Sequence, residues 1–329
     1  MALRVFWGFD HEATSQEVSD IVPGSTVVGV FSSITPYNDG RSFSFTLSAH
    51  KLDLLFDAQQ TWITGFHHHP DDPGAMALVE YKDGTTTQIK LLVNSAGQLQ
   101  VVHGGGAILA TTPDYYDDPT WKHVEFKAMI DNAAGAFEVR VNERIVLSAS
   151  GVDTQNTANA SANRVYFGVG DRLLDNLWIC DGAGATFNNF IGELRVITRR
   201  PNAPGFYTQW TPNTGLNWEA VDDEQTDNDT TYVSSIAPDN KDSFPLVALG
   251  VDSGAILAVG QNIRARKDDV DQREIAMLAR QDSTDYEGAN LELLATYRNW
   301  KEIRTTCPDT TEWTRENFAA MQFGYTQKV

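Results

Sequence analysis

The chain of 329 residues carries 25 basic and 44 acidic side chains, a formal net charge of −19. A surface of this kind repels phosphate backbones, so we expect no nucleic-acid partner, and the same charge keeps a β-rich chain soluble. The sequence has no apolar run of about 18 residues, which argues against membrane insertion, and its start lacks the apolar core of a signal peptide, which predicts synthesis in a cytoplasm. The two cysteines, Cys180 and Cys307, are expected as buried free thiols.

Residues 1–120 read as short strands between turn residues. Apolar side chains at every other position predict a strand at 43–47, with Phe43, Phe45 and Leu47 facing a core. A hairpin is predicted where the strand 89–93 pairs with the strand 99–101. The glycine run 104–106 lacks the lysine and the helix of a phosphate loop, so we interpret it as a bend between strands.

The stretch 120–201 is the most strongly patterned part of the chain. Period-two alternation predicts a meander of three antiparallel strands, at 124–130, 137–141 and 144–147, with a turn at Asn142-Glu143. The first of these strands places Val124, Phe126, Ala128 and Ile130 on one side and His123, Glu125, Lys127 and Met129 on the other. Two more strands are predicted, at 164–169 and 177–180, and the stretch closes on 192–196.

Several motifs in this stretch and beyond it occur together in a fixed order. They include W-x-x-V-E, G-x-F-x-V-R-V-N, D-x-L-W-I-C-D and N-N-F-I-G-E-L-R-V, followed by W-T-P at 210–212 and C-P-D-T-T-E-W-T at 307–314. Together they resemble the concanavalin A-like (laminin G-like) jelly-roll domains of tailed-bacteriophage virion proteins. The resemblance covers nearly the whole chain and implies an all-β protein, with a jelly-roll sandwich over 1–201 and a smaller β-rich domain over 202–329.

The composition shifts after a linker at about 202–210 that contains Pro, Gly and Asn. Strands of the second domain are predicted at 230–235, 244–249, 255–265 and 274–280. A short helix is predicted over 314–320, because Thr314 suits the N-cap position and Glu316 the first turn.

Two groups of residues could bind a metal ion. His67 and His69 share one face of a strand, with Asp71 two positions further, a set that could hold a transition metal; the alternative is a strand end that runs into an acidic surface loop. Asp175 and Asp181 bracket a strand where lectin-like sandwiches often hold calcium. The phage relatives often begin this strand with two acidic residues, whereas Asn176 follows Asp175 here, and both carboxylates could simply cap turns. No other cofactor is expected.

Catalysis and sugar binding can also be weighed from the sequence. Glycoside hydrolysis needs paired carboxylates, and the Glu-x-Asp-x-x-Glu and Glu-x-Asp-x-Glu signatures of jelly-roll glucanases are missing; the nearest groups are Asp10 with Glu12 and the cluster 222–224. The eight tryptophans could stack on sugars. Four of them fall in or beside strand patterns and are predicted as core residues, namely Trp7, Trp62, Trp121 and Trp178.

The resemblance implies a place in a virion and leaves the chemistry open. We therefore expect a non-enzymatic structural subunit of a virion, as a decoration, fibre or tail-associated protein, that forms a homo-oligomer and docks on other virion proteins. The alternative is a carbohydrate-binding module that attaches the particle to glycans of the bacterial surface, and a glycan hydrolase is the third hypothesis. The sequence does not distinguish head from tail.

Overall fold

The computed structural model describes residues 3–70, 74–113, 116, 119–168, 170, 172–250 and 253–329. It divides into two compact units: unit 1 comprises Met1–Asp10 and Thr14–Val196, and unit 2 comprises His11–Ala13 and Ile197–Val329. The predicted boundary at 201 therefore lies close to the start of the main part of unit 2. Both units are built almost wholly of antiparallel strands, which confirms the all-β fold class.

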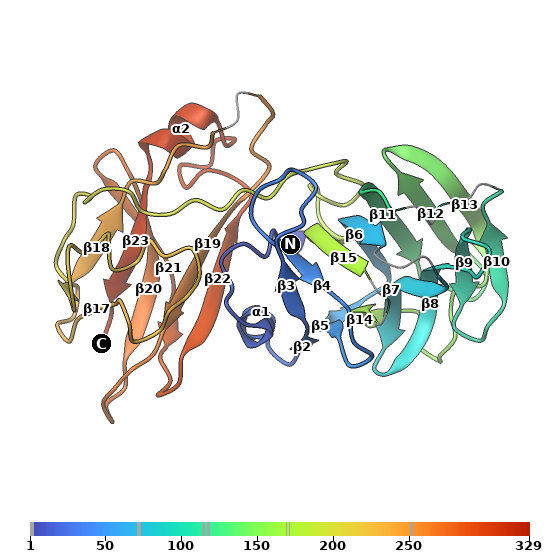
Figure 1. The fold of residues 1–329 in the computed structure, drawn as a ribbon, viewed down its shortest axis with the longest axis horizontal. Helices are drawn as coiled ribbons and strands as arrows, with labels where there is room; N and C mark the ends of the chain where they lie inside the picture. Colours follow the sequence, from blue (N-terminus) through green and yellow to red (C-terminus); the bar gives the residue numbers. More distant parts are fainter. Residues whose placement is uncertain are drawn as a thin grey trace. The chain divides into compact units, whose positions relative to one another are not determined.

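Unit 1 is a sandwich of two antiparallel sheets (Figure 1). Among the described residues, the first sheet has eight strands in the order β13-β12-β11-β6-β15-β4-β3, and β1 also pairs with β15. These strands are β1 (Leu3–Trp7), β3 (Val30–Ser32), β4 (Ser42–Ser44), β6 (Thr61–Pro70), β11 (Lys122–Met129), β12 (Gly135–Val141), β13 (Arg144–Val152) and β15 (Arg172–Asp181).

The second sheet of unit 1 has seven strands in the order β10-β9-β8-β7-β14-β5-β2. They are β2 (Thr26–Val28), β5 (Lys51–Gln59), β7 (Met76–Asp83), β8 (Thr86–Val93), β9 (Leu99–His103), β10 (Ile108–Thr111) and β14 (Ala162–Phe167), and one short helix, α1 (Ser15–Ile21), precedes β2. Two broad antiparallel sheets make unit 1 a β-sandwich, which agrees with the jelly-roll sandwich that the resemblance implied.

The core of unit 1 lies between the two sheets. Val124, Phe126, Ala128 and Ile130 are all buried there, which confirms the predicted inward face of β11. The ring of Phe126 stacks on Tyr81 of the opposite sheet at 5.1 Å between centroids. The prediction for Leu47 was wrong, since this side chain is 62% exposed: β4 ends at Ser44 and the chain turns at 47–50.

The turns of unit 1 follow the sequence closely. Asn142 and Glu143 have φ angles of 48° and 64°, so they form the left-handed turn that joins β12 to β13. The predicted hairpin of β8 and β9 is confirmed, and the glycine run 104–106 lies in the turn between β9 and β10, as expected. In contrast, β15 begins five residues before the predicted start at 177, at Arg172, because its first half is buried on both faces and shows no alternation.

One glycine marks the place where the chain changes sheets. Gly29 is the single residue between β2, the edge strand of the seven-stranded sheet, and β3, the edge strand of the eight-stranded sheet. A Cβ atom on Gly29 would lie 2.2 Å from the buried ring of Phe43. Only a glycine therefore lets one extended segment form an edge of both sheets.

Unit 2 consists of smaller antiparallel sheets. A four-stranded sheet has the order β18-β23-β20-β21, and β19 pairs with β22 and β16 with β17. The bounds are β16 (Thr211–Pro212), β17 (Val233–Ser234), β18 (Lys241–Phe244), β19 (Val259–Ala265), β20 (Glu274–Gln281), β21 (Thr284–Glu292), β22 (Arg298–Arg304) and β23 (Gln322–Gln327). The prediction at 274–280 is confirmed, whereas the strand predicted at 244–249 ends at Phe244 and the last three strands were missed.

The predicted helix of unit 2 is confirmed as α2 (Arg315–Ala320). Thr314 accepts a hydrogen bond from the backbone N–H of Asn317, and the Asn317 side chain accepts one from the backbone N–H of Thr314, which makes a capping box. Neither helix of the described residues is long or apolar enough to cross a membrane. Both cysteines are free and buried, as predicted.

Candidate functional site

A row of three titratable side chains crosses the eight-stranded sheet of unit 1. His123 on β11 lies opposite His67 on β6, and His67 lies opposite Asp175 on β15. Their neighbours in sequence point into the core, so these three side chains point to the outer face of the sheet. They are nevertheless buried, with exposed fractions of 2%, 4% and 5%.

The next row of the same face explains a glycine in β6. Gly65 lies between Glu125 of β11 and Trp178 of β15. A Cβ atom on Gly65 would come within 2.1 Å of the Trp178 ring, so the indole occupies the space that a side chain would fill. Glu125 in this row is fully buried as well.

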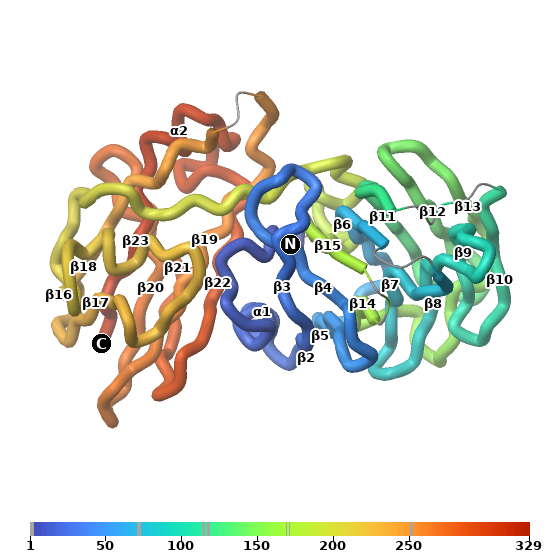
Figure 2. The backbone as a smooth tube through the Cα atoms, viewed as in Figure 1, coloured from blue at the N-terminus to red at the C-terminus, as the bar shows by residue number. Residues whose placement is uncertain are grey.

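The cover over both rows is residues 182–196, which we call the strap. The strap contains neither helix nor strand. It follows β15 directly along the chain, as the backbone trace shows (Figure 2). Glu125 accepts a hydrogen bond from the backbone N–H of Gly192 at 2.9 Å, and Lys127 donates to the side chain of Asn189 at 3.1 Å. Asn176 accepts from the backbone N–H of Val196 at 2.6 Å. Side chains of β11 and β15 thus hold the backbone and side chains of the strap.

Glu193 is the residue of the strap that reaches the row itself. Its Oε1 accepts a hydrogen bond from the Tyr37 hydroxyl at 2.8 Å and lies 3.2 Å from Nε2 of His67. Arg195 forms an ion pair with Asp39, and its guanidinium lies 5.2 Å from the centre of the Tyr37 ring. Tyr37 and Asp39 both lie in the loop between β3 and β4. This loop therefore contacts the strap in addition to β11 and β15.

Burial sets the protonation states in the row. It raises the pKa of Asp175 to about 8, and the nearby carboxylates of Asp10 and Asp39 act in the same direction. Burial lowers the pKa of His123 to about 4 and also lowers the pKa of His67. At pH 7 the row therefore holds two neutral imidazoles, and the protonated carboxyl group of Asp175 lies at its end beside His67.

The pKa of the two glutamates moves in opposite directions. Burial raises the pKa of Glu125. Burial would also raise the pKa of Glu193, but the hydrogen bonds from Tyr37 and His67 outweigh it and the net pKa is lowered. Glu193 is therefore the carboxylate of the site that stays ionised.

Proton exchange is the chemistry that these groups could perform, and perturbed pKa values cluster at functional sites. However, any reactant would have to lie beneath the strap. Among the described residues, five buried polar atoms of the two rows have no hydrogen-bond partner: Nδ1 of His67, Nδ1 and Nε2 of His123, Oε2 of Glu125 and Nε1 of Trp178. The site is thus closed and incompletely satisfied, which makes it sensitive to a change of charge.

The structure brings together only some of the residues proposed as metal ligands. His67 and Asp175 are neighbours, whereas Asp181 lies at the far end of β15, where it pairs with Arg4 and accepts a hydrogen bond from the backbone N–H of Ala183. His69 shares the outer face and packs against the ring of Trp121 at 5.3 Å. Asp71 lies outside the described residues.

Asp175 and Asp181 therefore do not share a calcium site. Within the described ranges, no group of three or more His, Cys, Asp or Glu side chains is placed to hold a metal ion.

The tryptophans of unit 1 are mostly core residues, as predicted. Trp7, Trp62 and Trp178 are fully buried, so their faces are closed to a sugar, and Trp121 is partly buried beside His69. The carboxylate of Asp10 accepts a hydrogen bond from the backbone N–H of Arg41 within unit 1.

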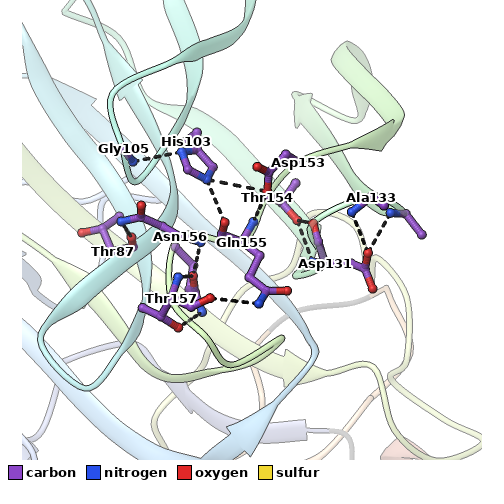
Figure 3. A network of polar contacts seen from close by, with 12 residues as sticks. Thr87, His103, Gly105, Asp131, Ala133, Asp153, Thr154, Gln155, Asn156 and Thr157 are labelled. Atoms are coloured by element: carbon purple, nitrogen blue, oxygen red, sulfur yellow. Dashed lines mark hydrogen bonds and ion pairs between the residues drawn. The ribbon is translucent and has the colours of Figure 1, made fainter.

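A second polar network holds the loops at one end of the sandwich (Figure 3). His103 lies 3.0 Å from the carbonyl oxygen of Gln155, and Asn156 donates to the carbonyl oxygen of Thr87 at 3.0 Å. Thr154 donates to the carbonyl of Met129 at 2.7 Å. These bonds tie the loop after β13 to β8, β9 and β11. The donors and acceptors of this network satisfy one another's hydrogen bonds. We therefore interpret the network as a structural feature that fixes the loops.

Most of the site was not recognised from the sequence. His123 and Glu125 share one side of the predicted strand at 124–130, Glu125 ends the W-x-x-V-E motif, and Glu193 lies in the N-N-F-I-G-E-L-R-V motif, but none of these signals brings the residues together. Tyr37 and Glu193 lie in irregular segments, and their approach to His67 depends on the register of β11, β6 and β15.

Comparisons with known proteins were made for the sequence and for the structure. No family model and no curated protein matches the sequence. Among solved structures, the chain is similar to a sialidase of Trypanosoma rangeli in complex with 2,3-difluorosialic acid, with 12% identity and a TM-score of 0.37. This match covers 47% of the chain and 27% of the sialidase, so the chain spans about a quarter of that protein.

Two further similar structures match the chain over more of their own length. The alginate lyase Aly36B is 12% identical with a TM-score of 0.36, covering 54% of this chain and 96% of the lyase. Domain 4 of AbnA, an extracellular arabinanase from Geobacillus stearothermophilus in complex with arabinotriose, is 16% identical with a TM-score of 0.37, covering 57% and 97%. Similarities with TM-scores this low do not indicate an activity for this chain.

Proposed function

We propose that this protein is a non-enzymatic structural subunit of a bacteriophage virion that docks on other particle proteins. The observation that carries the proposal is the closed state of the titratable row. His67, His123 and Asp175 are the groups that acid–base chemistry would need, and all three are buried beneath the strap. Several of the motifs that resemble phage virion proteins lie in strands of unit 1, and the motif N-N-F-I-G-E-L-R-V forms the end of the strap that closes the site, which agrees with an attachment role.

The distribution of exposed apolar side chains supports docking. Unit 2 is the smaller unit, yet it carries nine of the fifteen large apolar side chains that are exposed among the described residues. Val270 is 97% exposed. Exposed apolar groups are thus more numerous on unit 2 than on unit 1, and we expect the docking surface on unit 2. The nine are Phe206, Leu216, Tyr232, Ile236, Val247, Leu257, Val270, Leu294 and Val329.

Immunogold electron microscopy of intact particles, with antibodies against this chain, tests the proposal. We expect label at a defined position on the virion and a homo-oligomer when the purified protein is weighed by analytical ultracentrifugation. The same preparation is incubated with host polysaccharide and applied to a glycan array. Turnover of polysaccharide would contradict the non-enzymatic role, and glycan binding without particle label would favour the carbohydrate-binding alternative.

A further inference from the structure

We propose that the strap is a latch controlled by protons: it stays docked on the outer face of unit 1 while Asp175 is protonated, and ionisation of Asp175 beneath it favours release. The inference concerns unit 1 alone and does not depend on the proposed function.

The way the strap is held makes it suited to release. Strands in a sheet are joined by backbone ladders that do not titrate, whereas no residue of 182–196 belongs to a strand. At four of its anchors a titratable side chain of the sheet or the facing loop takes part: Glu125 holds Gly192, Lys127 holds Asn189, Tyr37 and His67 hold Glu193, and Asp39 pairs with Arg195. A further anchor, the side chain of Asn176, is the neighbour of Asp175 in sequence.

The charges that face Asp175 make its ionisation unfavourable while the strap is closed. Asp10 and Asp39 lie near enough to repel a negative charge at this position, and Arg195 of the strap is the cation that would attract it. Arg195 is already paired with Asp39. His67, the direct neighbour on β6, is neutral at pH 7 because burial lowers its pKa, and it is oriented toward Glu193. A second negative charge beneath the strap would thus lack a free counter-charge in the site as described.

The sign of the pH dependence follows from the two states. The closed strap holds the pKa of Asp175 near 8, whereas water around an open site would return it toward its ordinary 3.8. The closed state therefore binds a proton that the open state releases, and each pH unit between these values shifts the balance about tenfold toward the open state. The buried Glu125, whose pKa is also raised, acts in the same direction.

The histidines act in the opposite direction at lower pH. The closed state lowers the pKa of His123 from 6.5 to about 4, so closure expels a proton and is favoured as pH rises through this range. His67 adds to this effect, and Glu193, whose pKa is lowered, does so below its ordinary 4.5. Below pH 6.5 the carboxyl groups and the imidazoles therefore shift the balance between the closed and open strap in opposite directions. From pH 6.5 to about 8 the Asp175 carboxyl remains and favours opening.

Hydrogen–deuterium exchange of the full chain tests the latch. Exchange of peptides from 182–196 is measured between pH 6 and 9, corrected for intrinsic exchange, and compared with peptides of β11. We expect protection of the strap to fall about tenfold or more between pH 6.5 and 8 and to level off above that. Asp175→Asn should abolish this fall, because an amide cannot ionise but still accepts the hydrogen bond that Asp175 receives from the backbone of Asn176.

Asp53→Asn is the matched control, since Asp53 pairs with Arg164 on the seven-stranded sheet, away from the strap, and should leave the fall unchanged. If Asp175→Asn does not fold, the pH dependence of strap protection in the unchanged protein still tests the proposal. Protection of the strap that is constant from pH 6.5 to 8.5, or that falls equally in β11, would overturn the proposal.

Discussion

The two units belong to the same all-β class but are stabilised differently. In unit 1 one continuous cluster of buried apolar residues fills the space between two broad sheets. The buried apolar cluster of unit 2 is small; in the described residues it consists of Val259, Ala279, Cys307, Trp313, Met321 and Phe323. Sheets of four and two strands offer less inner surface, so apolar burial contributes less to the stability of unit 2.

Unit 2 instead relies on networks of polar side chains. Lys241 bridges Asp285 at 2.9 Å and Glu287 at 3.0 Å, and Arg280 donates to the same Asp285 at 2.5 Å. Asp242 is fully buried and accepts hydrogen bonds from the backbone N–H groups of 209 and 210. Two units of the same fold class thus differ in how much of their interior is apolar and how much is polar.

The largest effect is expected from the core of unit 1. Phe126→Ala removes a fully buried ring that stacks on Tyr81, and we expect a loss of about 3–5 kcal/mol in the free energy of unfolding. Denaturant unfolding followed by exchange of β11 peptides measures it. The matched variant Phe323→Ala in unit 2 should cost less, about 2 kcal/mol, because its small cluster can close around the gap. Equal losses would mean that the two cores do not differ as described.

The next effect probes the polar network of unit 2. Asp242→Ala leaves two backbone donors and the side chain of Asn217 without their acceptor, so we expect a loss of about 3 kcal/mol. Asp242→Asn keeps one acceptor oxygen and should cost about half as much. Thermal unfolding of both variants gives the ranking. A loss below about 0.5 kcal/mol for the alanine variant would show that the network contributes little.

Acid should weaken unit 2 through Glu287. Burial would raise the pKa of this side chain, but hydrogen bonds from Lys328, Lys241 and Thr326 outweigh it and lower the pKa from 4.5 to about 2. Its contribution is therefore present above pH 4.5 and is lost as pH falls toward 2. Glu287→Gln should flatten the acid dependence of unit 2 unfolding by about 1 kcal/mol, since the group is partly exposed. An unchanged acid dependence would contradict this role.

The smallest effect is expected at the start of α2. Thr314→Ala removes one half of the capping box and should cost about 1 kcal/mol. Thr314→Ser keeps the acceptor oxygen and serves as the control. Circular dichroism cannot isolate six residues, so exchange of the helix amides is the measurement. Equal protection in the alanine and serine variants would exclude a capping contribution.

Local patterns predicted local structure well. The meander β11–β13 was predicted because alternation and a two-residue turn specify it without distant partners. The sequence did not predict β21–β23, since β21 has no regular alternation and is mostly exposed. Nor could it predict the pairing of β19 with β22, which brings together segments more than thirty residues apart.

The candidate site, too, depends on contacts between segments that are distant in the sequence. His67 and Asp175 were singled out from the sequence, but in two separate groups, and Asp181, the expected partner of Asp175, lies at the other end of β15. Their actual neighbours depend on how β11, β6 and β15 align, and a shift by one residue would turn the row into the core. The strap could not be predicted, because its position depends on single side chains such as Glu125 and Asn176 rather than on a period.

Gly29 limits how the two sheets of unit 1 can move relative to each other. β2 and β3 are one extended segment that forms an edge of both sheets. Because the chain joins the two sheets covalently on this side, they cannot slide past each other there. The opposite border is formed by two separate strands, β10 and β13. Any sliding of the two sheets against each other is therefore confined to the border at β10 and β13.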